Sequence, residues 1–252
     1  MATVQELIKA LPLFSDLRAE DAAVLLRNSR VLGCKRGQFV FMHGDTITHF
    51  YMICTGTIQV FRETPDGHEI TNDILIAGDT LNSDEVVARH SAHMVNARAV
   101  EDSTLLEIPV AWMRGHLKDF DHLAEKILAS IADRLHNVQM EAEQLSTMSA
   151  TQMVACYLQK LCVLYDFDPH GFDLPYTKTL IASRLRIEKE TFSRALLSLR
   201  DLGIMVSGKH VSIRDMRKAD DFACGECSIA GECGTHRILH EKMEARTAKK
   251  AH

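Results

Sequence analysis

The sequence predicts an α+β protein: an N-terminal antiparallel β-roll, then a long dimerisation helix, then a C-terminal winged helix-turn-helix. Three changes of pattern predict this order. Short apolar runs separated by turns fill residues 31–109, a heptad-like apolar repeat follows, and two short helical patterns precede a pair of strands. We therefore divide the chain into a β-roll domain (1–115), a dimerisation helix (116–146), a winged helix-turn-helix domain (147–217) and a cysteine-rich tail (218–252).

The β-roll is predicted by short strand-like runs with turn residues between them. The clearest runs are residues 38–42, 50–53, 57–61 and 70–76. Pro65-Asp66-Gly67-His68 joins the last two runs and is typical of a hairpin turn. Apolar residues at helical spacing predict a short helix at 21–32 before the first strand. This half of the chain is therefore expected to be antiparallel β.

The long helix is predicted by apolar residues that recur at alternating steps of three and four from Leu117 to Leu145, without proline or glycine. This is the repeat of a left-handed coiled coil, whose apolar seam needs a partner. We expect a symmetric, parallel homodimer; the alternative is an amphipathic helix that lies on its own domain. The predicted dimerisation residues are Leu117, Phe120, Ala124, Ile127, Ile131, Leu135 and Val138.

The distribution of charge points to nucleic acid, although the total does not. The 252-residue chain has a formal net charge of -5, while residues 176–218 carry ten Lys or Arg against four acids, a local balance of about +6. No run approaches the roughly 18 apolar residues of a membrane helix. Residues 1–14 contain Glu6 and Lys9 where a signal peptide has its apolar core. We expect a cytoplasmic protein with no membrane partner.

The basic segment has the pattern of a winged helix-turn-helix. Thr177 is placed to cap a short helix, and a turn at 186–188 leads to a second helix at 189–202 that Gly203 closes. Residues 206–214 then suggest a two-stranded wing. Polar side chains at the start of the second helix are of the types that contact base edges and phosphates in a major groove, although a solvated charged face is the general alternative. The predicted DNA-binding residues are Lys178, Arg184, Lys189, Glu190, Ser193 and Arg194.

The tail carries a motif suited to a metal or a cluster. Three of the seven cysteines form the pattern C-x2-C-x5-C-x2-H, whose members are Cys224, Cys227, Cys233 and His236. The short spacings and the glycines let three thiolates converge on one centre. We favour an iron–sulfur cluster; structural zinc in a Cys3His site and a metal-free Cys224–Cys227 dithiol switch are the alternatives. The other four cysteines lie singly among apolar residues, where inert buried thiols are expected: Cys34, Cys54, Cys156 and Cys162.

The chain from about Leu11 to Arg217 resembles the CRP/FNR superfamily of transcription regulators. The segment Glu190-Thr191-Phe192-Ser193-Arg194 looks like the recognition-helix signature Glu-x-x-Ser-Arg of the FNR branch. Turn glycines similar to those of the family's cyclic-nucleotide-binding-type β-roll are Gly37, Gly44, Gly56 and Gly78.

This resemblance implies a sequence-specific regulator whose dimer binds double-stranded DNA. Glu190, Ser193 and Arg194 would read TTGAT-like half-sites of an inverted repeat, while Lys178, Arg184 and Lys189 would contact phosphates. RNA polymerase is a further expected partner if the protein is an activator. No nucleophile–base pair or glycine-rich phosphate motif is recognisable, so we expect no catalytic residues and no enzyme.

The expected signal is not a cyclic nucleotide. His93-Met94 stands about where family members that bind cyclic AMP carry an Arg-Ser or Arg-Thr pair, and a phosphate diester needs that fixed cation. Haem in the β-roll is less favoured than a cluster, because thirteen histidines make any single candidate weak. The candidate axial ligands are His43, His49, His68, His90 and His93.

The tail resembles a branch of FNR-like regulators with an oxygen-labile four-iron four-sulfur cluster after the wing. In that branch three C-terminal cysteines and a carboxylate from elsewhere hold the cluster, which here implies Cys224, Cys227 and Cys233. The fourth ligand stays open: His236 is nearest in sequence, and the other candidates are Asp221, Glu226, Asp133 and Glu141. The hypothesis is that oxygen, nitric oxide or iron supply changes the cluster and thereby the affinity for DNA.

Overall fold

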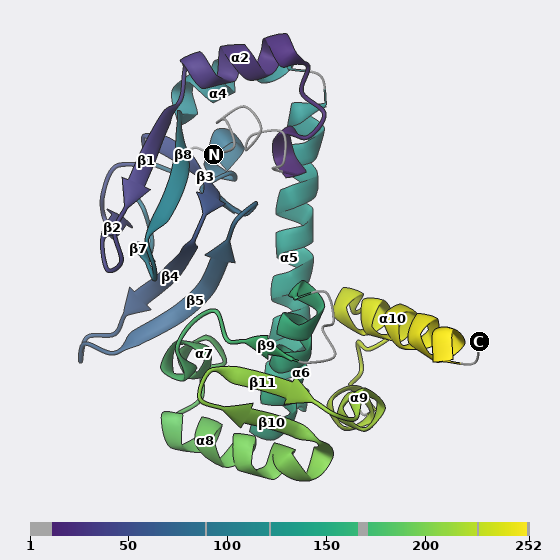
Figure 1. Cartoon of the computed structure of the whole chain (residues 1–252). Helices are drawn as coiled ribbons and strands as arrows, with labels where there is room; N and C mark the ends of the chain where they lie inside the picture. The colour runs from purple at the N-terminus through teal and green to yellow at the C-terminus, as the bar shows by residue number, and fades with distance from the viewer. Residues whose placement is uncertain (1–11, 89, 121, 166–170, 226, 251–252) are drawn as a thin grey trace. The chain divides into compact units, whose positions relative to one another are not determined.

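The computed structural model describes residues 12–88, 90–120, 122–165, 171–225 and 227–250. The chain forms two compact units, Met1–His136 and Asn137–His252, and each is described by itself (Figure 1). The α+β architecture predicted from the sequence is confirmed, with a β-roll in the first unit and a winged helix-turn-helix in the second.

The first unit is built on two four-stranded antiparallel sheets, ordered β1-β8-β3-β6 and β2-β7-β4-β5. Apolar side chains of both sheets meet between them, and Ile53 and Leu105 of one sheet and Ile58 and Ala97 of the other are fully buried there. The strands are β1 (Arg30–Cys34), β2 (Phe39–Phe41), β3 (His49–Thr55), β4 (Thr57–Glu63), β5 (Glu69–Ile76), β6 (Thr80–Leu81), β7 (Asn96–Ala99) and β8 (Ser103–Pro109).

The four predicted strand runs coincide with β2, β3, β4 and β5. The predicted hairpin turn joins β4 and β5: the N–H of Thr64 donates to the His68 carbonyl at 2.8 Å, and Gly67 has a φ of 84° that glycine adopts without strain. The predicted helix at 21–32 is shorter in the structure, because α2 (Ala19–Arg27) ends where Asn28 caps it and the chain enters β1 at Arg30.

Helices cover the other face of the β1-β8-β3-β6 sheet. Side chains of α2, α4 (Val110–His116) and the first turns of α5 (Leu123–Thr147) form one core with Phe50, Met52 and Leu106. Shorter segments complete the unit: the 3-10 helices η1 (Pro12–Phe14) and η2 (Leu117–Asp119), and α3 (Glu85–Ala88).

This packing corrects the N-terminal end of the predicted dimer seam. Phe120 and Ile127 are 5% and 1% exposed within their own unit, and Leu117 packs against the same core. A heptad pattern does not show whether a helix packs on another chain or on its own domain. The sequence therefore placed Phe120 and Ile127 in the dimer interface, whereas both pack inside the first unit. Ile131, a further predicted dimer residue, is half-buried and packs against the same core. The exposed apolar residues of α5 on the same seam are Leu128, Leu135, Val138, Ala142 and Leu145.

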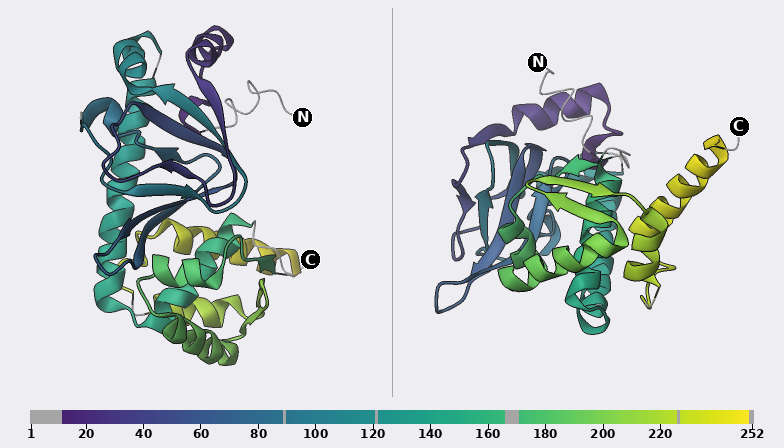
Figure 2. Two further views of the ribbon diagram at one scale, coloured as in Figure 1. Left: turned by 90° about the vertical axis from the view of Figure 1, so that its left-hand side faces the viewer. Right: turned by 60° about the horizontal axis from the view of Figure 1, so that its bottom comes forward.

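After the last turns of α5, the second unit continues with α6 (Ala150–Leu164). Ser149 and Gln152 form a capping box, in which each side chain bonds the other residue's backbone N–H. The helix-turn-helix follows as α7 (Lys178–Arg184) and α8 (Lys189–Ser198), extended by the 3-10 helix η3 (Leu199–Leu202). Gly203 ends it in the left-handed conformation, as predicted. The wing is the hairpin β10 (Ile204–Ser207) and β11 (His210–Ile213), to which β9 (Phe172–Asp173) adds a third strand (Figure 2).

The tail is helical and belongs to the core of the second unit. Helices α9 (Met216–Cys224) and α10 (Gly234–Lys250) both pack against α6, and Ala219, Ala223 and Leu239 are fully buried there. The predicted boundary between residues 217 and 218 therefore falls inside α9. Within the described ranges, none of the helices combines the length and apolar character needed to cross a membrane.

Candidate nucleic-acid interface and thiol-rich centre

Helix α8 holds the predicted base-reading residues in solvent. Phe192 and Ala195 are 2% and 3% exposed and pack into the core that α8 shares with α6. Because this face is buried, the opposite face is fixed outward. The exposed residues on it are Lys189, Glu190, Ser193 and Arg194.

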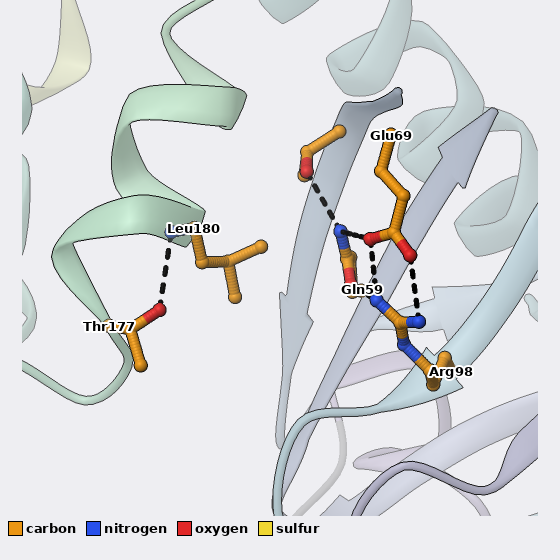
Figure 3. Close-up of polar contacts among 6 residues, drawn as sticks. Gln59, Glu69, Arg98, Thr177 and Leu180 are labelled. Atoms are coloured by element: carbon orange, nitrogen blue, oxygen red, sulfur yellow. Dashed lines mark hydrogen bonds and ion pairs between the residues drawn. The ribbon is translucent and has the colours of Figure 1, made fainter. Parts of the chain in front are cut away.

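The helix before it, α7, is positioned by local chemistry. The Thr177 hydroxyl accepts the N–H of Leu180 at 3.2 Å, which is the predicted N-cap (Figure 3). In the turn after α7, Arg186 has a φ of 56°, and the N–H of Ile187 donates to Ala182 at 3.0 Å. The tight turn sets the angle at which α8 leaves α7. Lys178, a predicted phosphate contact, is half-buried on α7.

Arg184 differs from its expected role. Its guanidinium lies 2.5 Å from the Glu141 carboxylate on α5, and the side chain is only 18% exposed. A charge held in this way joins the helix-turn-helix to the end of α5 and is not free to contact a phosphate. We therefore regard Arg184 as a positioning residue.

The tail brings a carboxylate, a thiol and an imidazole together at one point. Single ligand atoms of Asp220, Cys224 and His236 all lie within 4.8 Å of one another. Asp220 precedes Cys224 by one helical turn on α9, so both side chains share a face, and His236 comes from the first turn of α10. With Cys227 and Cys233, which the turns between α9 and α10 fold back, these residues form what we call the tail centre.

Asp220 is the buried anchor of the tail centre. Its side chain is 4% exposed, and its two oxygens lie 3.1 Å from His236 Nδ1 and 2.8 Å from His240 Nε2. A carboxylate that holds one ring nitrogen of a histidine leaves the other nitrogen available to a metal. Asp221, the carboxylate predicted as a ligand, is exposed; Asp220 was not predicted, although its four-residue spacing to Cys224 was a usable signal.

The thiols of the tail centre share their surroundings with Cys156 of α6. Burial, then the nearby charge of Asp220, raises the pKa of Cys224, and Cys156 and Cys227 raise it further. Burial raises the pKa of Cys156 to about 11, and the charges of Cys233, Cys227 and Asp220 act in the same direction. Cys156 is a buried thiol in the apolar core, as predicted, and it also lies within electrostatic range of Cys227 and Cys233.

The donor set fits a thiolate-bound metal or cluster. Thiolates are soft ligands that select zinc and iron–sulfur clusters, and an imidazole suits zinc or iron. Buried thiolates and a carboxylate repel one another as anions, so only a cation among them makes their ionised forms favourable. Of the other expected ligands, Glu141 is paired with Arg184, Asp133 belongs to the first unit, and Glu226 lies outside the described residues.

The tail centre is attached to the end of α5. The Ser228 hydroxyl, between Cys227 and Cys233, donates to Glu143 Oε1 at 2.5 Å. The amide of Gln144 lies 3.9 Å from the Cys156 sulfur. The end of the seam helix thus contacts both the cysteine loop and the helix-turn-helix.

In the β-roll, the polar groups are satisfied internally. Arg98 pairs with both oxygens of Glu69 at 2.6 and 2.8 Å and donates to Gln59 at 2.8 Å (Figure 3). Its guanidinium also lies over the ring of Phe61. The amide of Gln59 in turn donates to the Thr71 hydroxyl at 2.9 Å. An arginine neutralised in this way offers no vacant cation to a phosphate.

The histidines considered for haem are dispersed over the β-roll. His93 is buried and stacks on Phe41 with a centroid distance of 3.6 Å, and burial lowers its pKa. His90 is exposed and bonded to Glu85 at 2.7 Å. His49 lies 3.8 Å from Glu107, and His43 and His68 are exposed. Among the described residues, the group with metal-ligand spacing is in the tail.

Comparison with known proteins matches both halves of the chain. Residues 31–119 match the family model "Cyclic nucleotide-binding domain", and residues 152–218 match "Crp-like helix-turn-helix domain". A β-roll followed by this type of helix-turn-helix defines a DNA-binding regulator that couples a sensor to a recognition helix. The chain belongs to the CRP/FNR superfamily of transcription regulators. The second match ends before the first tail cysteine.

Named relatives agree with this assignment. The chain is 28% identical over 186 residues to the "Anaerobic regulatory protein" of Pasteurella multocida, covering 72% of this chain and 67% of the relative. It is 27% identical over 185 residues to the "Fumarate and nitrate reduction regulatory protein" of Escherichia coli, covering 72% and 73%. The structure of FixK2 from Bradyrhizobium japonicum shares the fold, with a TM-score of 0.67 at 18% identity over 77% of this chain and 96% of that one. The relatives are transcription regulators, and the chain is a regulator and not an enzyme.

Proposed function

We propose that the protein is a cytoplasmic, homodimeric, FNR-type regulator that binds inverted-repeat DNA and responds to a redox or gas signal through an iron–sulfur cluster in its tail centre. The observation that carries this proposal is the packing of the two tail helices, with Cys224 at the end of α9, against α6, the helix that also packs against the recognition helix α8. The names of the relatives, which include anaerobic regulation, support a signal of this kind.

DNA reading is assigned to the exposed face of α8. Glu190, Ser193 and Arg194 would contact base edges of TTGAT-like half-sites, and Lys178 and Lys189 would contact phosphates. If the protein activates transcription, RNA polymerase is a further partner. Arg194→Ala is expected to weaken operator binding by about 1–3 kcal/mol and to relax specificity at one base pair, in a shift assay with point-mutated operators.

Dimerisation is assigned to the exposed stripe of α5. Leu135 and Val138 are 59% and 55% exposed, and large apolar residues at coiled-coil spacing need a partner. Leu135→Glu should give a monomer in sedimentation and abolish binding to the inverted repeat. Val87→Glu is the matched control, because Val87 is a comparably exposed apolar residue on α3. A monomeric wild-type protein that still binds the repeat would overturn the dimer.

Three thiolates of the tail centre, Cys224, Cys227 and Cys233, would hold the cluster. When bound, such a cluster supplies a thiolate-ligated iron centre that is sensitive to oxidation. The residues around it would transmit its state: Ser228 bonds Glu143 near the end of α5, and Glu141, half a turn earlier, bonds Arg184 of the helix-turn-helix. Rearrangement of the loop that carries Ser228 would therefore act on the position of α7 and α8.

Anaerobic purification tests the cluster. Iron and sulfide content, visible absorption and Mössbauer spectra should report a four-iron cluster, and operator affinity should change by roughly 5–150-fold when oxygen destroys it. A colourless protein that contains zinc, with affinity unchanged by metal removal, would support structural zinc instead. An affinity change with thiol oxidation in metal-free protein would support the dithiol switch. Haem or cyclic AMP would be shown by a Soret band or by direct binding.

A further inference from the structure

We propose that Cys156 of α6 supplies the fourth thiolate of the cluster, so that the cluster ties the tail directly to the helix behind the recognition helix. The assignment rests on the proposed function, because it presumes that the three tail cysteines bind iron and sulfide. The new element is a ligand that lies outside the tail motif.

The first support is the packing of α6 against the tail. Cys156 is 6% exposed and lies in one core cluster with Ala219 and Ala223 of α9, against which Cys224 also packs. Gln152, one turn before Cys156, donates to the backbone carbonyl of Phe222 on α9 at 3.4 Å. The stripe of α6 that carries Cys156 therefore faces the helix that carries Cys224.

The second support is the electrostatic environment of Cys156. Burial opposes ionisation of Cys156 most strongly; the charge of Lys160 favours it, and the charges of Cys233, Cys227 and Asp220 oppose it. Cys156 in turn opposes ionisation of Cys224. A buried thiol near other thiols and a carboxylate is suited to a shared cation, because a bound metal reverses the cost of its ionisation.

The third support is a buried donor on the same stripe. Gln159 lies seven residues after Gln152 and so returns to the same helical face. Its side chain is 1% exposed, and its Nε2 has no acceptor among the described residues. Leaving a buried amide unpaired costs about 1–3 kcal/mol. Thiolate and sulfide sulfurs accept such N–H groups, and these hydrogen bonds help to set cluster potentials.

The competing fourth ligand is His236. It has the geometry of a metal-bound histidine, because Asp220 holds its Nδ1. However, Asp220 also bonds His240, so the carboxylate and the two histidines form a network that is complete without a metal. The Cys156 sulfur has only the weak contact with the Gln144 amide. Four cysteines are also the usual ligand set of a four-iron cluster.

Four anaerobically reconstituted proteins decide between these ligands: the wild type, Cys156→Ser, His236→Ala and Cys162→Ser. Cys162 is the matched control, because it is 3% exposed on the same helix. We expect Cys156→Ser to lose about a quarter of its iron and to show the electron paramagnetic resonance signal of a three-iron cluster when oxidised. His236→Ala and Cys162→Ser should keep the wild-type iron content and spectrum. Wild-type behaviour of Cys156→Ser, together with iron loss in His236→Ala, would overturn the proposal.

A second measurement needs no substitution. X-ray absorption of the zinc-loaded wild-type chain should show four sulfur neighbours around the metal if Cys156 is a ligand, whereas three sulfurs and one nitrogen would overturn it. This result stands even if Cys156→Ser fails to fold. It also separates the two proposals: a wild type that takes zinc but no iron contradicts the cluster, while the number of sulfur neighbours still decides the role of Cys156.

Discussion

The β-roll and the tail centre, the two possible sensors of this chain, differ in how their buried polar groups are balanced. In the β-roll, the Arg98 guanidinium is neutralised by the Glu69 carboxylate and also donates to Gln59. The Gln59 amide in turn donates to the Thr71 hydroxyl. In the tail centre, the Asp220 carboxylate is paired with His236 and His240, while burial and the nearby Asp220 charge oppose ionisation of the Cys224 thiol beside it.

This difference indicates where an external ligand is needed. A site whose donors and acceptors pair with one another gains little from a ligand, because binding would first have to break those pairs. A site made of acids and thiols gains from a cation, because the cation permits the ionised state. The family's usual ligand-binding domain is therefore the self-contained part here, and the tail is the part to which we assign the response in our proposal.

The largest expected effect comes from replacing one buried cysteine by serine, first in the tail centre and then, as the comparison, in the β-roll. Cys233→Ser should abolish cluster binding and change operator affinity by roughly 5–150-fold, because it removes a ligand and with it the coupling. Cys34→Ser, in the β-roll core at 3% exposed, should lower stability without changing iron content. Iron analysis and operator titration of both variants check this. Equal iron loss in the two variants would remove the distinction between the regions.

Next in size is the Arg98 network. Arg98→Ala should lower the free energy of unfolding of the first unit by about 1–3 kcal/mol, because Glu69 and Gln59 lose a charged partner. The single tryptophan, Trp112 on α4, reports this unit alone in urea titrations followed by fluorescence. Arg36→Ala, at an exposed arginine of the same unit, is the control. A change in iron content or in operator response would show that the β-roll takes part in sensing.

Most of the fold was predictable from the sequence because its determinants are local. The N-cap at Thr177, the left-handed Gly203 and the alternation of the strands each depend on neighbours a few residues away. The burial of Phe120 and Ile127 was not predictable, because a heptad repeat looks the same whether its partner is another chain or its own sheet.

The candidate site was predictable only in part. The three tail cysteines and His236 can be recognised in the sequence by their spacing. The exposed residues of α8 can be recognised because their polar side chains are of the types that contact DNA. The partnership of Arg184 with Glu141 and the approach of Cys156 to the tail are tertiary contacts between distant segments. No local pattern encodes such contacts, so a paired arginine looked like a phosphate ligand, and the sequence did not show that Cys156 lies near the tail.

A smaller effect should follow from loosening the link between the tail and α5. Ser228→Ala removes the hydrogen bond to Glu143 but none of the proposed ligands, so the cluster should be retained. The difference in operator affinity between cluster-bound and oxidised protein should shrink by about 0.5–1.5 kcal/mol. Glu232→Gln, at an exposed acid of the same loop, should leave it unchanged. If the affinity difference is undiminished in Ser228→Ala, the hydrogen bond to Glu143 does not couple the cluster to DNA binding. Cys156 on α6 would then be the remaining link between the cluster and the recognition helix.

The smallest effect concerns pH and belongs to the β-roll. Burial lowers the pKa of His93 below its usual value of about 6.5, and Asp45 and Glu85 oppose this only in part. The unfolded chain therefore binds a proton more readily, so this contribution to stability is present above about pH 6.5 and is lost as the pH falls toward the folded pKa. His90 acts with the opposite sign, because its hydrogen bond to Glu85 raises its pKa. Urea unfolding followed by Trp112 should show a loss of stability on acidification that His93→Phe, which keeps a ring beside Phe41, reduces. An unchanged pH dependence in that variant would mean that another group of the β-roll titrates.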